Sequence, residues 1–337
     1  MDKKEFLKNK VEYGDIFFTR SSLVKKGIAH SNINLSNEED LTYDGHLIRM
    51  QPKKDIAFPS FLAYNFITSN TRNKFIKRGK TTTMTTIGQE DIASVEINIP
   101  SLLEQQKIAS FLSAVDEKLQ ALKKKKSLLE QYKKGVMQKI FFQEIRFKDD
   151  NGKDFPDWEE KLVGEVIEFI NGKAHENDID INGKYIVVNS KFVSTEGRIK
   201  KFSNKQILSL FKNDIVLVMS DVPNGKALAK CYLIDNDNTY TLNQRICALR
   251  EDKCNNAFLI YLINRNDYYL SFDSGVGQTN LRKEDVLNCP LIIPSSLVKQ
   301  TKIADFLSAI DAKINHCQTQ IVKTEQFKKG LLQQMFC

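Results

Sequence analysis

The 337-residue chain contains 50 Lys+Arg and 42 Asp+Glu, which give a formal net charge of +8, and its hydrophobic content is 41%. This composition excludes a disordered, collagen-like or membrane-spanning chain, because the apolar runs are far shorter than the ~20 residues of a membrane helix. The length predicts two domains, and the excess of positive charge favours a polyanionic partner such as nucleic acid. The first residues are charged and no apolar core follows them, so we expect no secretory signal and a cytoplasmic location.

In chain order, the pattern predicts an α/β (α+β) protein of five segments. We expect a first globular domain at 1–104, a long helix at 105–141, a linker at 142–157, a second globular domain at 158–299 and a second long helix at 300–337. Within the second domain, β-rich runs predict five strands and an apolar run predicts a helix that begins at Ala257 and continues towards Tyr269. The expected strands are Val166–Ile170, Tyr185–Val188, Ile215–Met219, Ala229–Ile234 and Ile246–Leu249.

The two halves of the chain are copies of one another. The segments Gln106–Lys118 and Thr301–Lys313 share the pattern Lys-Ile-Ala-x-Phe-Leu-Ser-Ala-(Val/Ile)-Asp-x-Lys, and Gly14–Phe17 weakly matches Asn213–Val216. An internal repeat of this kind predicts two similar structural units, each a globular part followed by a long helix.

The first copy is much shorter than the second, since little precedes Tyr13 whereas Trp158–Lys212 precedes the corresponding strand of the second copy. We therefore expect the first globular domain to be N-terminally truncated and to lack strands equivalent to Val166–Ile170 and Tyr185–Val188. The sequence leaves open whether the reading frame begins late or another chain completes the fold.

Each expected long helix carries an apolar heptad pattern over more than four heptads, which predicts a coiled-coil seam. At 1.5 Å per residue each helix is about 50 Å long, and one such helix cannot bury its own seam. The simplest arrangement is an antiparallel pair between two globular domains, related by a pseudo-twofold repeat. The expected seam residues are Ile108, Leu112, Val115, Leu119, Leu122, Leu129, Val136, Ile303, Leu307, Ile310, Ile314, Ile321 and Leu331.

The sequence offers no convincing catalytic or metal-binding motif. The tail Gly79-Lys80-Thr81 lacks the earlier glycine of a phosphate-binding loop, and the chain has no Pro-Pro of an adenine methyltransferase motif. The six cysteines form no CxxC pair and all lie in the second half, while the four histidines are scattered, so we expect reduced thiols and no structural zinc.

DNA-binding features are more numerous. Lys and Arg side chains supply phosphate contacts, hydroxyl groups fix the register, and Gln, Asn and Arg can read base edges. Such residues cluster around two corresponding pairs of turns in the copies. The candidates are Arg20, Ser21, Arg72, Lys74, Lys77, Arg78, Lys80, Thr81, Thr82, Thr83, Ser220, Asn224, Lys226, Gln278, Thr279, Asn280 and Arg282.

The repeated segments at 99–118 and 293–313 resemble those of the specificity (S) subunit of type I restriction-modification enzymes. The copies Tyr132–Gly135 and Phe327–Gly330 also match that family, as does Phe155–Trp158 before the second domain. The resemblance covers nearly the whole chain.

The resemblance implies a non-catalytic subunit with two target-recognition domains, each reading one half of a split DNA target. The paired helices would act as a ruler and as the docking site of two methyltransferase (M) subunits, and restriction/translocase (R) subunits would join for restriction. S-adenosylmethionine, ATP and Mg would belong to those partners, with no cofactor in this chain and no membrane partner. The alternative is a partly inactive S-like protein that acts only as a protein-interaction scaffold.

Overall fold

The structure is a computed structural model that describes residues 3–222, 225–251 and 253–336. The chain divides into two compact units. Unit 1 comprises Met1–Glu130 and Lys313–Cys337, and unit 2 comprises Gln131–Ala312. Each unit contains part of both long helices. No helix in the described part of the chain is long and apolar enough to cross a membrane.

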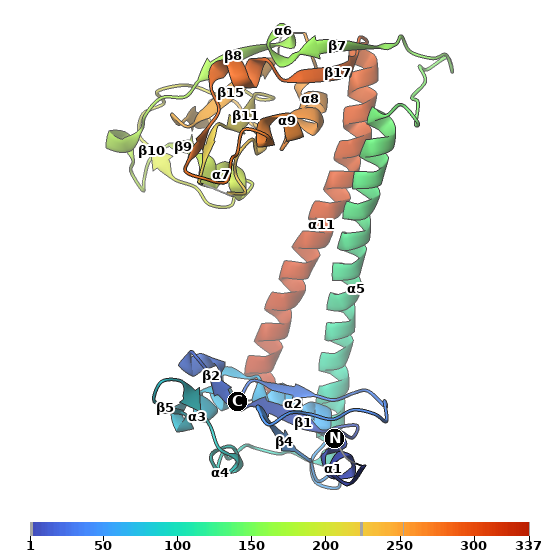
Figure 1. Ribbon diagram of the computed structural model, residues 1–337, viewed down its shortest axis with the longest axis vertical. Helices are drawn as coiled ribbons and strands as arrows, with labels where there is room; N and C mark the ends of the chain where they lie inside the picture. Colours follow the sequence, from blue (N-terminus) through green and yellow to red (C-terminus); the bar gives the residue numbers. More distant parts are fainter. Residues whose placement is uncertain (1–2, 223–224, 252, 337) are drawn as a thin grey trace. The chain divides into compact units, whose positions relative to one another are not determined.

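Unit 1 contains a three-stranded antiparallel sheet of order β3-β1-β4 and a small ribbon of order β2-β6-β5 (Figure 1). Its elements are α1 (Lys3–Asn9), β1 (Ile16–Thr19), β2 (Ser21–Ser22), η1 (Lys25–Gly27), β3 (Ser31–Ile33), β4 (Leu47–Met50), α2 (Pro59–Phe66), α3 (Ser69–Arg78), β5 (Lys80–Thr81), β6 (Thr85–Thr86) and α4 (Gln89–Ala93). The core forms where alternate β1 residues face the helices: the Phe18 ring lies 5.3 Å from Phe66 and 5.5 Å from Phe75.

Unit 2 contains a four-stranded sheet of order β13-β11-β15-β8, a second sheet of order β10-β9-β14, and two-stranded ribbons β12-β16 and β17-β7. Its strands are β7 (Trp158–Leu162), β8 (Ile167–Asn171), β9 (Tyr185–Val188), β10 (Phe202–Ser203), β11 (Ile215–Val218), β12 (Ser220–Asp221), β13 (Cys231–Leu233), β14 (Tyr240–Leu242), β15 (Ile246–Glu251), β16 (Thr279–Asn280) and β17 (Pro290–Pro294). Its short helices are α6 (Val163–Val166), η2 (Glu176–Asp178), α7 (Ser190–Ser194), α8 (Asn256–Ile263), α9 (Asp267–Leu270) and α10 (Lys283–Leu287).

The expected strands of the second domain are present, but two expectations were wrong in detail. The expected helix from Ala257 towards Tyr269 is interrupted, because Arg265 adopts a φ of 59°, and the Asn266 side chain then caps the separate helix α9. Val166 belongs to α6 rather than to a strand, because Glu165 accepts a hydrogen bond from the Leu162 N–H at 2.6 Å and starts a helical turn there.

The main sheets of the two units have the same register. In unit 1, Ile16 pairs with Ile33 and Met50, and in unit 2 the corresponding Ile215 pairs with Leu233 and Leu249. The repeat seen in the sequence is therefore a repeat of the β1-β3-β4 core as β11-β13-β15. The carboxylate before the first strand repeats as well: Asp15 pairs with Arg49 at 2.6 Å, and Asp214 pairs with Arg250 at 2.9 Å.

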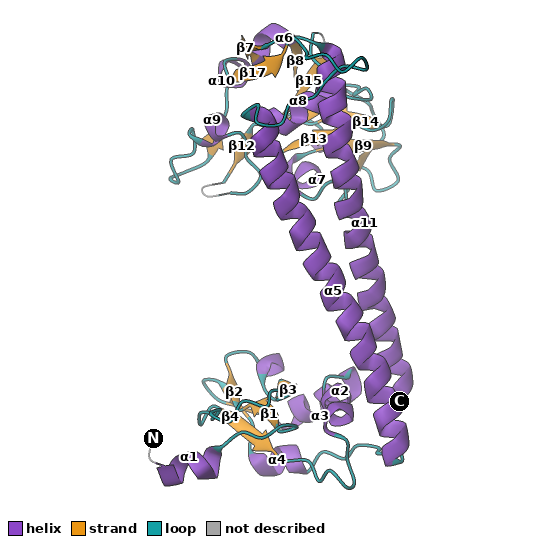
Figure 2. Cartoon of the chain, turned by 90° about the vertical axis from the view of Figure 1, so that its right-hand side faces the viewer, coloured by secondary structure: helices purple, strands orange, loops and turns teal. Residues whose placement is uncertain are grey.

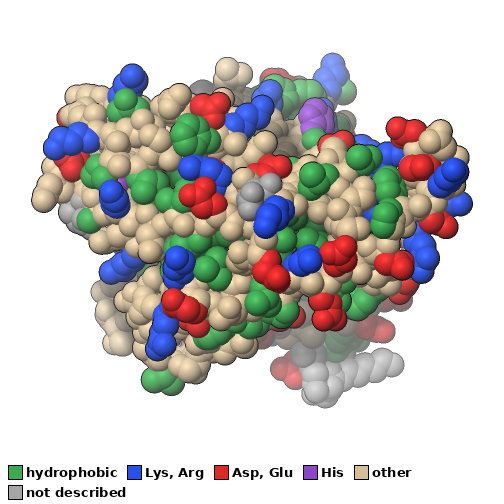
Figure 3. Space-filling view, turned by 90° about the horizontal axis from the view of Figure 1, so that it is seen from above, with side chains coloured by type: hydrophobic (Ala, Val, Ile, Leu, Met, Phe, Trp, Pro, Cys, Tyr) green, Lys and Arg blue, Asp and Glu red, His purple; other side chains and the backbone are tan. Residues whose placement is uncertain are grey.

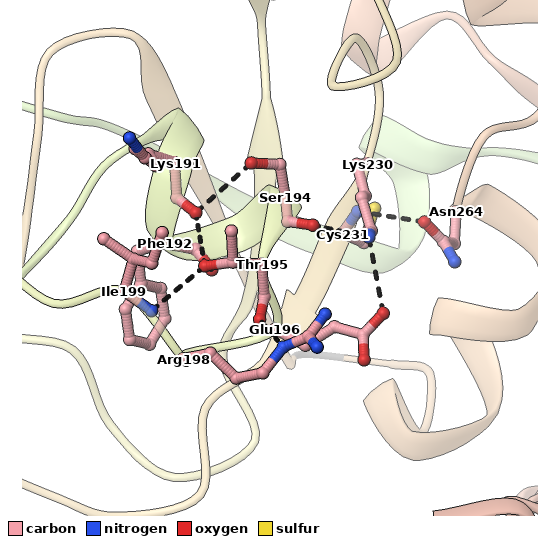
Figure 4. A network of polar contacts seen from close by, with 10 residues as sticks. All are labelled: Lys191, Phe192, Ser194, Thr195, Glu196, Arg198, Ile199, Lys230, Cys231 and Asn264. Atoms are coloured by element: carbon pink, nitrogen blue, oxygen red, sulfur yellow. Dashed lines mark hydrogen bonds and ion pairs between the residues drawn. The ribbon is translucent and has the colours of Figure 1, made fainter. Parts of the chain in front are cut away.

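The units differ in a second layer of strands and a helix that packs on one face of the main sheet in unit 2. In unit 2, Val216 and Val218 are buried in a cluster that includes side chains of β9, β14 and α7. Polar bonds hold α7 and the end of α8 to the start of β13: the Lys230 ammonium donates to the Ser194 carbonyl at 3.0 Å, and the Asn264 side chain after α8 accepts from the Cys231 N–H (Figure 4). Among its described residues, unit 1 has no strands equivalent to β8 and β9, as the shorter first copy predicts.

The two long helices are α5 (Leu102–Phe141) and α11 (Leu297–Met335). They begin slightly before the expected residues 105 and 300, because the hydroxyls of Ser101 and Ser296 accept from the N–H groups of Glu104 and Lys299 and cap the first turns. Within unit 1 the helices run antiparallel, since Asp116 pairs with Lys328 and the later Lys123 pairs with the earlier Glu325 (Figure 2).

The side chains at the expected seam positions are buried or half-buried along both helices. The fully buried members include Leu112 in unit 1 and Leu307 in unit 2. Each helix also ends on the other copy's globular part. The Phe336 ring lies 5.1 Å from Phe61 of α2, and the Phe141 ring lies 6.2 Å from Phe258 of α8.

Replacing Leu112 or Leu307 with Ala should lower the free energy of unfolding by about 2–5 kcal/mol, because each fully buried side chain leaves a cavity. Chemical unfolding followed by circular dichroism measures the change. The matched control is Leu128→Ala at an exposed position of the same α5 helix, which should cost less than ~0.5 kcal/mol. Equal losses in all three variants would contradict a buried seam.

Candidate nucleic-acid interface

In unit 2, three of the candidate base-reading residues lie on one side of a strand. Gln278, Asn280 and Arg282 are exposed, whereas the intervening Thr279 and Leu281 are buried. This alternation arises because β16 pairs with β12, so successive side chains point to opposite faces. The ribbon therefore presents two amides and a guanidinium together, and a two-stranded ribbon is narrow enough for the major groove of DNA.

Hydrogen bonds within the ribbon hold these side chains in place. The Gln278 amide donates to the Ser220 hydroxyl at 2.5 Å and to the Asn280 side-chain oxygen at 3.2 Å. The Thr279 hydroxyl donates to the Asp273 carboxylate at 3.0 Å. Thr279 and Ser220 are both buried, so we exclude them from the DNA-facing set and assign them to bracing the ribbon.

The turn after β12 is organised by one carboxylate. Asp221 accepts from the backbone N–H groups of Ala227 at 2.6 Å and Leu228 at 3.0 Å, which ties the start of the following segment to the end of β12. Lys226 is exposed on this loop, and the candidate Asn224 lies outside the described residues.

Unit 1 carries the same ribbon with different side chains. β2 pairs with β6 in the register of β12 with β16, so that Ser21 lies opposite Thr86 as Ser220 lies opposite Asn280. Thr85 and Ile87 are buried, as Thr279 and Leu281 are, and the exposed positions equivalent to Gln278 and Asn280 hold Met84 and Thr86. Met84 has no strong hydrogen-bonding group, so the sequence analysis did not select it as a candidate. Its equivalence to Gln278 follows from the shared register of the two ribbons.

A hollow of about 500 Å³ lies beside the unit 1 ribbon. Two cationic side chains line it, Arg20 and Lys80, together with Ser21 and Thr86. The Lys80 side chain is 81% exposed and its ammonium is 4.0 Å from Asp91. Cations and hydroxyls around one hollow suit a phosphate oxygen.

The basic residues of α3 divide into two groups. Arg72 donates to the backbone carbonyls of Ala29 and Lys26, and half-burial lowers the pKa of its guanidinium. Lys74 donates to the Glu96 carbonyl, and Arg78 to the Ser94 hydroxyl and carbonyl. These three side chains hold loops of unit 1 together.

Lys77 is exposed, as is Lys80 in the strand that follows α3, which makes these two the better placed for phosphate contact. Thr81, Thr82 and Thr83 are exposed at the same turn, with the Thr81 hydroxyl 3.0 Å from that of Thr85.

The described residues contain no group of three or more His, Cys, Asp or Glu side chains that could hold a metal ion. The described cysteines are free and buried, and burial raises the pKa of the Cys254 thiol to about 12. On the face of unit 2 that includes β7, α6 and β17, basic and acidic side chains are interspersed (Figure 3). That face lacks the single-sign charge expected of a DNA-binding surface.

Comparisons with known proteins identify relatives along most of the chain. A family model described as the type I restriction modification DNA specificity domain matches residues 3–131 and 156–324. The MjaVIII type I restriction enzyme specificity subunit of Methanocaldococcus jannaschii is 26% identical over 311 residues, which cover 85% of this chain and 71% of that protein. The StySPI type I specificity subunit of Salmonella potsdam is 21% identical and covers 81% of this chain and 64% of its own length.

Solved structures share the fold. The S subunit of a type I restriction-modification system from M. genitalium aligns with a TM-score of 0.66 at 15% identity, covering 98% of this chain and 84% of that one. A chain from a structural study of complex assembly in the type I R-M system aligns with a TM-score of 0.53 at 15% identity, covering 97% of this chain and 82% of that one.

Replacing Gln278, Asn280 or Arg282 with Ala should relax recognition at one base position of one half-site, since one bidentate contact contributes ~1–3 kcal/mol of discrimination. Selection of bound sequences from a randomised DNA library measures the change. The matched control is Gln206→Ala, because the Gln206 amide donates to the Tyr240 carbonyl away from the ribbon. Unchanged selection by all three ribbon variants would show that β16 is not the reader.

Proposed function

The chain belongs to the type I restriction modification DNA specificity family, and from this premise we propose that it reads a bipartite DNA target, with one half-site for each unit. Members of this family are non-catalytic specificity subunits that recognise the DNA target of the system.

One observation carries the proposal: both units hold the same β-ribbon in the same register but with different exposed side chains. Unit 2 offers Gln278, Asn280 and Arg282, and unit 1 offers Met84 and Thr86 beside Lys80. The amides and guanidinium of unit 2 suit hydrogen-bonding base edges, whereas the methionine of unit 1 suits apolar contact with a thymine methyl group. Two copies of one element with different readers imply two different half-sites.

The long helices would set the distance between the half-sites. Each helix has its first turns in one unit and its last turns in the other, and no proline interrupts either helix. A continuous helix has a fixed rise of 1.5 Å per residue, so its length is a suitable ruler. This proposal predicts one preferred spacer between the half-sites.

The same helices carry exposed aromatic residues in repeated positions, which suit two copies of one partner. In unit 1, Phe111 and Phe327 are 45% and 54% exposed and flank a groove of about 370 Å³ that also includes Val115. In unit 2 the equivalent residues are Phe306 and Tyr132, which are 37% and 54% exposed. Exposed apolar patches of this kind mark interaction sites.

We assign these paired positions to two methyltransferase (M) subunits, with R subunits joining the assembly for restriction. S-adenosylmethionine, ATP and Mg would then be bound by the partners, because this family supplies recognition rather than catalysis. The complex would operate on double-stranded DNA.

Co-expression with the cognate methyltransferase should produce adenine methylation at one asymmetric bipartite motif, because the two ribbons carry different readers. Sequencing that detects methylated bases across the genome measures it. The control is the methyltransferase expressed without this chain, which should leave the motif unmodified. A half-motif or palindrome would contradict reading by both units, and no motif at all would favour the scaffold function.

Replacing Phe327 with Asp should abolish copurification of one methyltransferase subunit, because it removes an exposed ring that the partner would bury and leaves a charge that the interface would have to desolvate. The ratio of the two proteins in the purified complex measures the loss. Ile181→Asp is the matched control, since Ile181 is an 88% exposed aliphatic residue away from the long helices. Equal copurification by both variants would contradict docking at this groove.

A further inference from the structure

A three-residue contact joins α2, α5 and α11 in unit 1. The Tyr64 hydroxyl donates to one carboxylate oxygen of Asp116 at 2.9 Å, and the Lys328 ammonium lies 2.6 Å from the other oxygen. The Lys328 ammonium also lies 5.5 Å from the centre of the Tyr64 ring. Tyr64 comes from the globular part, whereas Asp116 and Lys328 come from the two long helices. We call this contact node 1.

Unit 2 contains the same contact, built from the equivalent residues. The Tyr261 hydroxyl of α8 donates to Asp311 of α11 at 2.9 Å, and Lys133 of α5 lies 2.6 Å from the other oxygen of that carboxylate. The Lys133 ammonium lies 4.9 Å from the centre of the Tyr261 ring. We call this contact node 2. The helices exchange roles between the nodes, so each node uses the early part of one helix and the late part of the other.

In each unit, a glutamine near the start of one long helix also attaches the globular part to that helix. The buried Gln105 accepts from the Phe58 N–H at 2.8 Å, and the buried Gln300 accepts from the Asn255 N–H at 2.8 Å. Phe58 and Asn255 are the N-cap residues of α2 and α8. Apolar contacts also attach the globular parts, since Phe336 packs on Phe61 in unit 1 and Phe141 packs on Phe258 in unit 2.

Each node adds a polar attachment point that joins the globular part to both long helices. Asp116 lies about 16 Å along α5 from Gln105, at a rise of 1.5 Å per residue, and Asp311 follows Gln300 by the same interval on α11. Two points along a rigid helix define an orientation that one point does not. The nodes include no residue of the ribbon strands β2, β6, β12 or β16.

We propose that the two Tyr–Asp–Lys nodes are positioning residues that fix the orientation of each recognition domain on the helix pair and thereby restrict the target to one spacer length. This inference rests on the proposed bipartite recognition. It assigns the spacer length to nodes 1 and 2 and the half-site bases to the ribbons.

The chemistry of the nodes suits this task. Each carboxylate receives a hydrogen bond from Tyr and a charge-assisted contact from Lys at separate oxygens, which is more directional than apolar packing. Burial and the neighbouring Asp116 raise the pKa of Tyr64 to about 12, so its hydroxyl remains a donor at neutral pH. Burial and Asp311 likewise raise the pKa of Tyr261.

The test uses the full chain assembled with its cognate methyltransferase and a DNA library in which the wild-type half-sites are separated by spacers of different lengths. The variants are Tyr64→Phe, Tyr261→Phe and the double variant, which keep each ring and remove only the hydroxyl. Tyr13→Phe is the matched control, because Tyr13 is 51% exposed. Each single variant should lose about tenfold in discrimination against neighbouring spacer lengths, equivalent to ~1.4 kcal/mol, with the half-site bases unchanged.

Unchanged spacer discrimination in the Tyr variants, with a lower melting temperature alone, would overturn the inference and leave bipartite recognition intact. Altered half-site bases would also overturn it. If the wild-type complex methylates no bipartite motif, the proposed function itself fails, and the inference fails with it.

Discussion

The heptad seam of the long helices is the constraint on which the rest of the structure depends. Neither α5 nor α11 can bury its own apolar stripe, so the two must pair, and pairing brings the end of each helix to the globular part of the other copy. Phe336 against Phe61 and Phe141 against Phe258 are the resulting contacts. Each globular part is consequently held by both helices. The chain continues from it directly into one helix, and the end of the other helix packs against it.

The repeat separates the residues that both copies share from the exposed residues that differ between them. The sheet register, the buried glutamine at the start of the helix and the Tyr–Asp–Lys node recur almost unchanged. The exposed positions of the ribbon do not, since Gln278 and Asn280 correspond to Met84 and Thr86. If the exposed ribbon residues read the DNA as proposed, specificity can change without a change in assembly, because the ribbon residues and the attachment residues are different.

The long helices and the repeat were predictable from the sequence, because a period of 3.5 residues and a duplicated motif are local signals. The alternation of exposed and buried residues around β16 could not be predicted from the sequence. That strand has only two residues, and the burial of Thr279 depends on its pairing with β12 and on Asp273. Arg72 was predicted to contact phosphate because the sequence does not show its partners. The guanidinium binds the carbonyls of Lys26 and Ala29, which are distant in sequence. Positive charge in the sequence predicted that α3 and the following turn contact DNA. Only the tertiary contacts show which of these cations bind backbone carbonyls and which are exposed.

Tertiary contacts also distinguish one face of the main sheet in the two units. In unit 2 this face is covered by a second layer, which includes β9, β14 and α7. The shared register aligns Thr19 with Val218, Asn32 with Tyr232 and Arg49 with Ala248. Ala248 leaves room for the side chains of the second layer, whereas Arg49 fills that space and pairs with Asp15. Thr19 and Asn32 replace side chains that unit 2 packs against its second layer. Phe17, which aligns with Val216, packs on Tyr43 on the same face, so this face of unit 1 carries both apolar and polar side chains, and a second layer over it would have to pair Thr19 and Asn32.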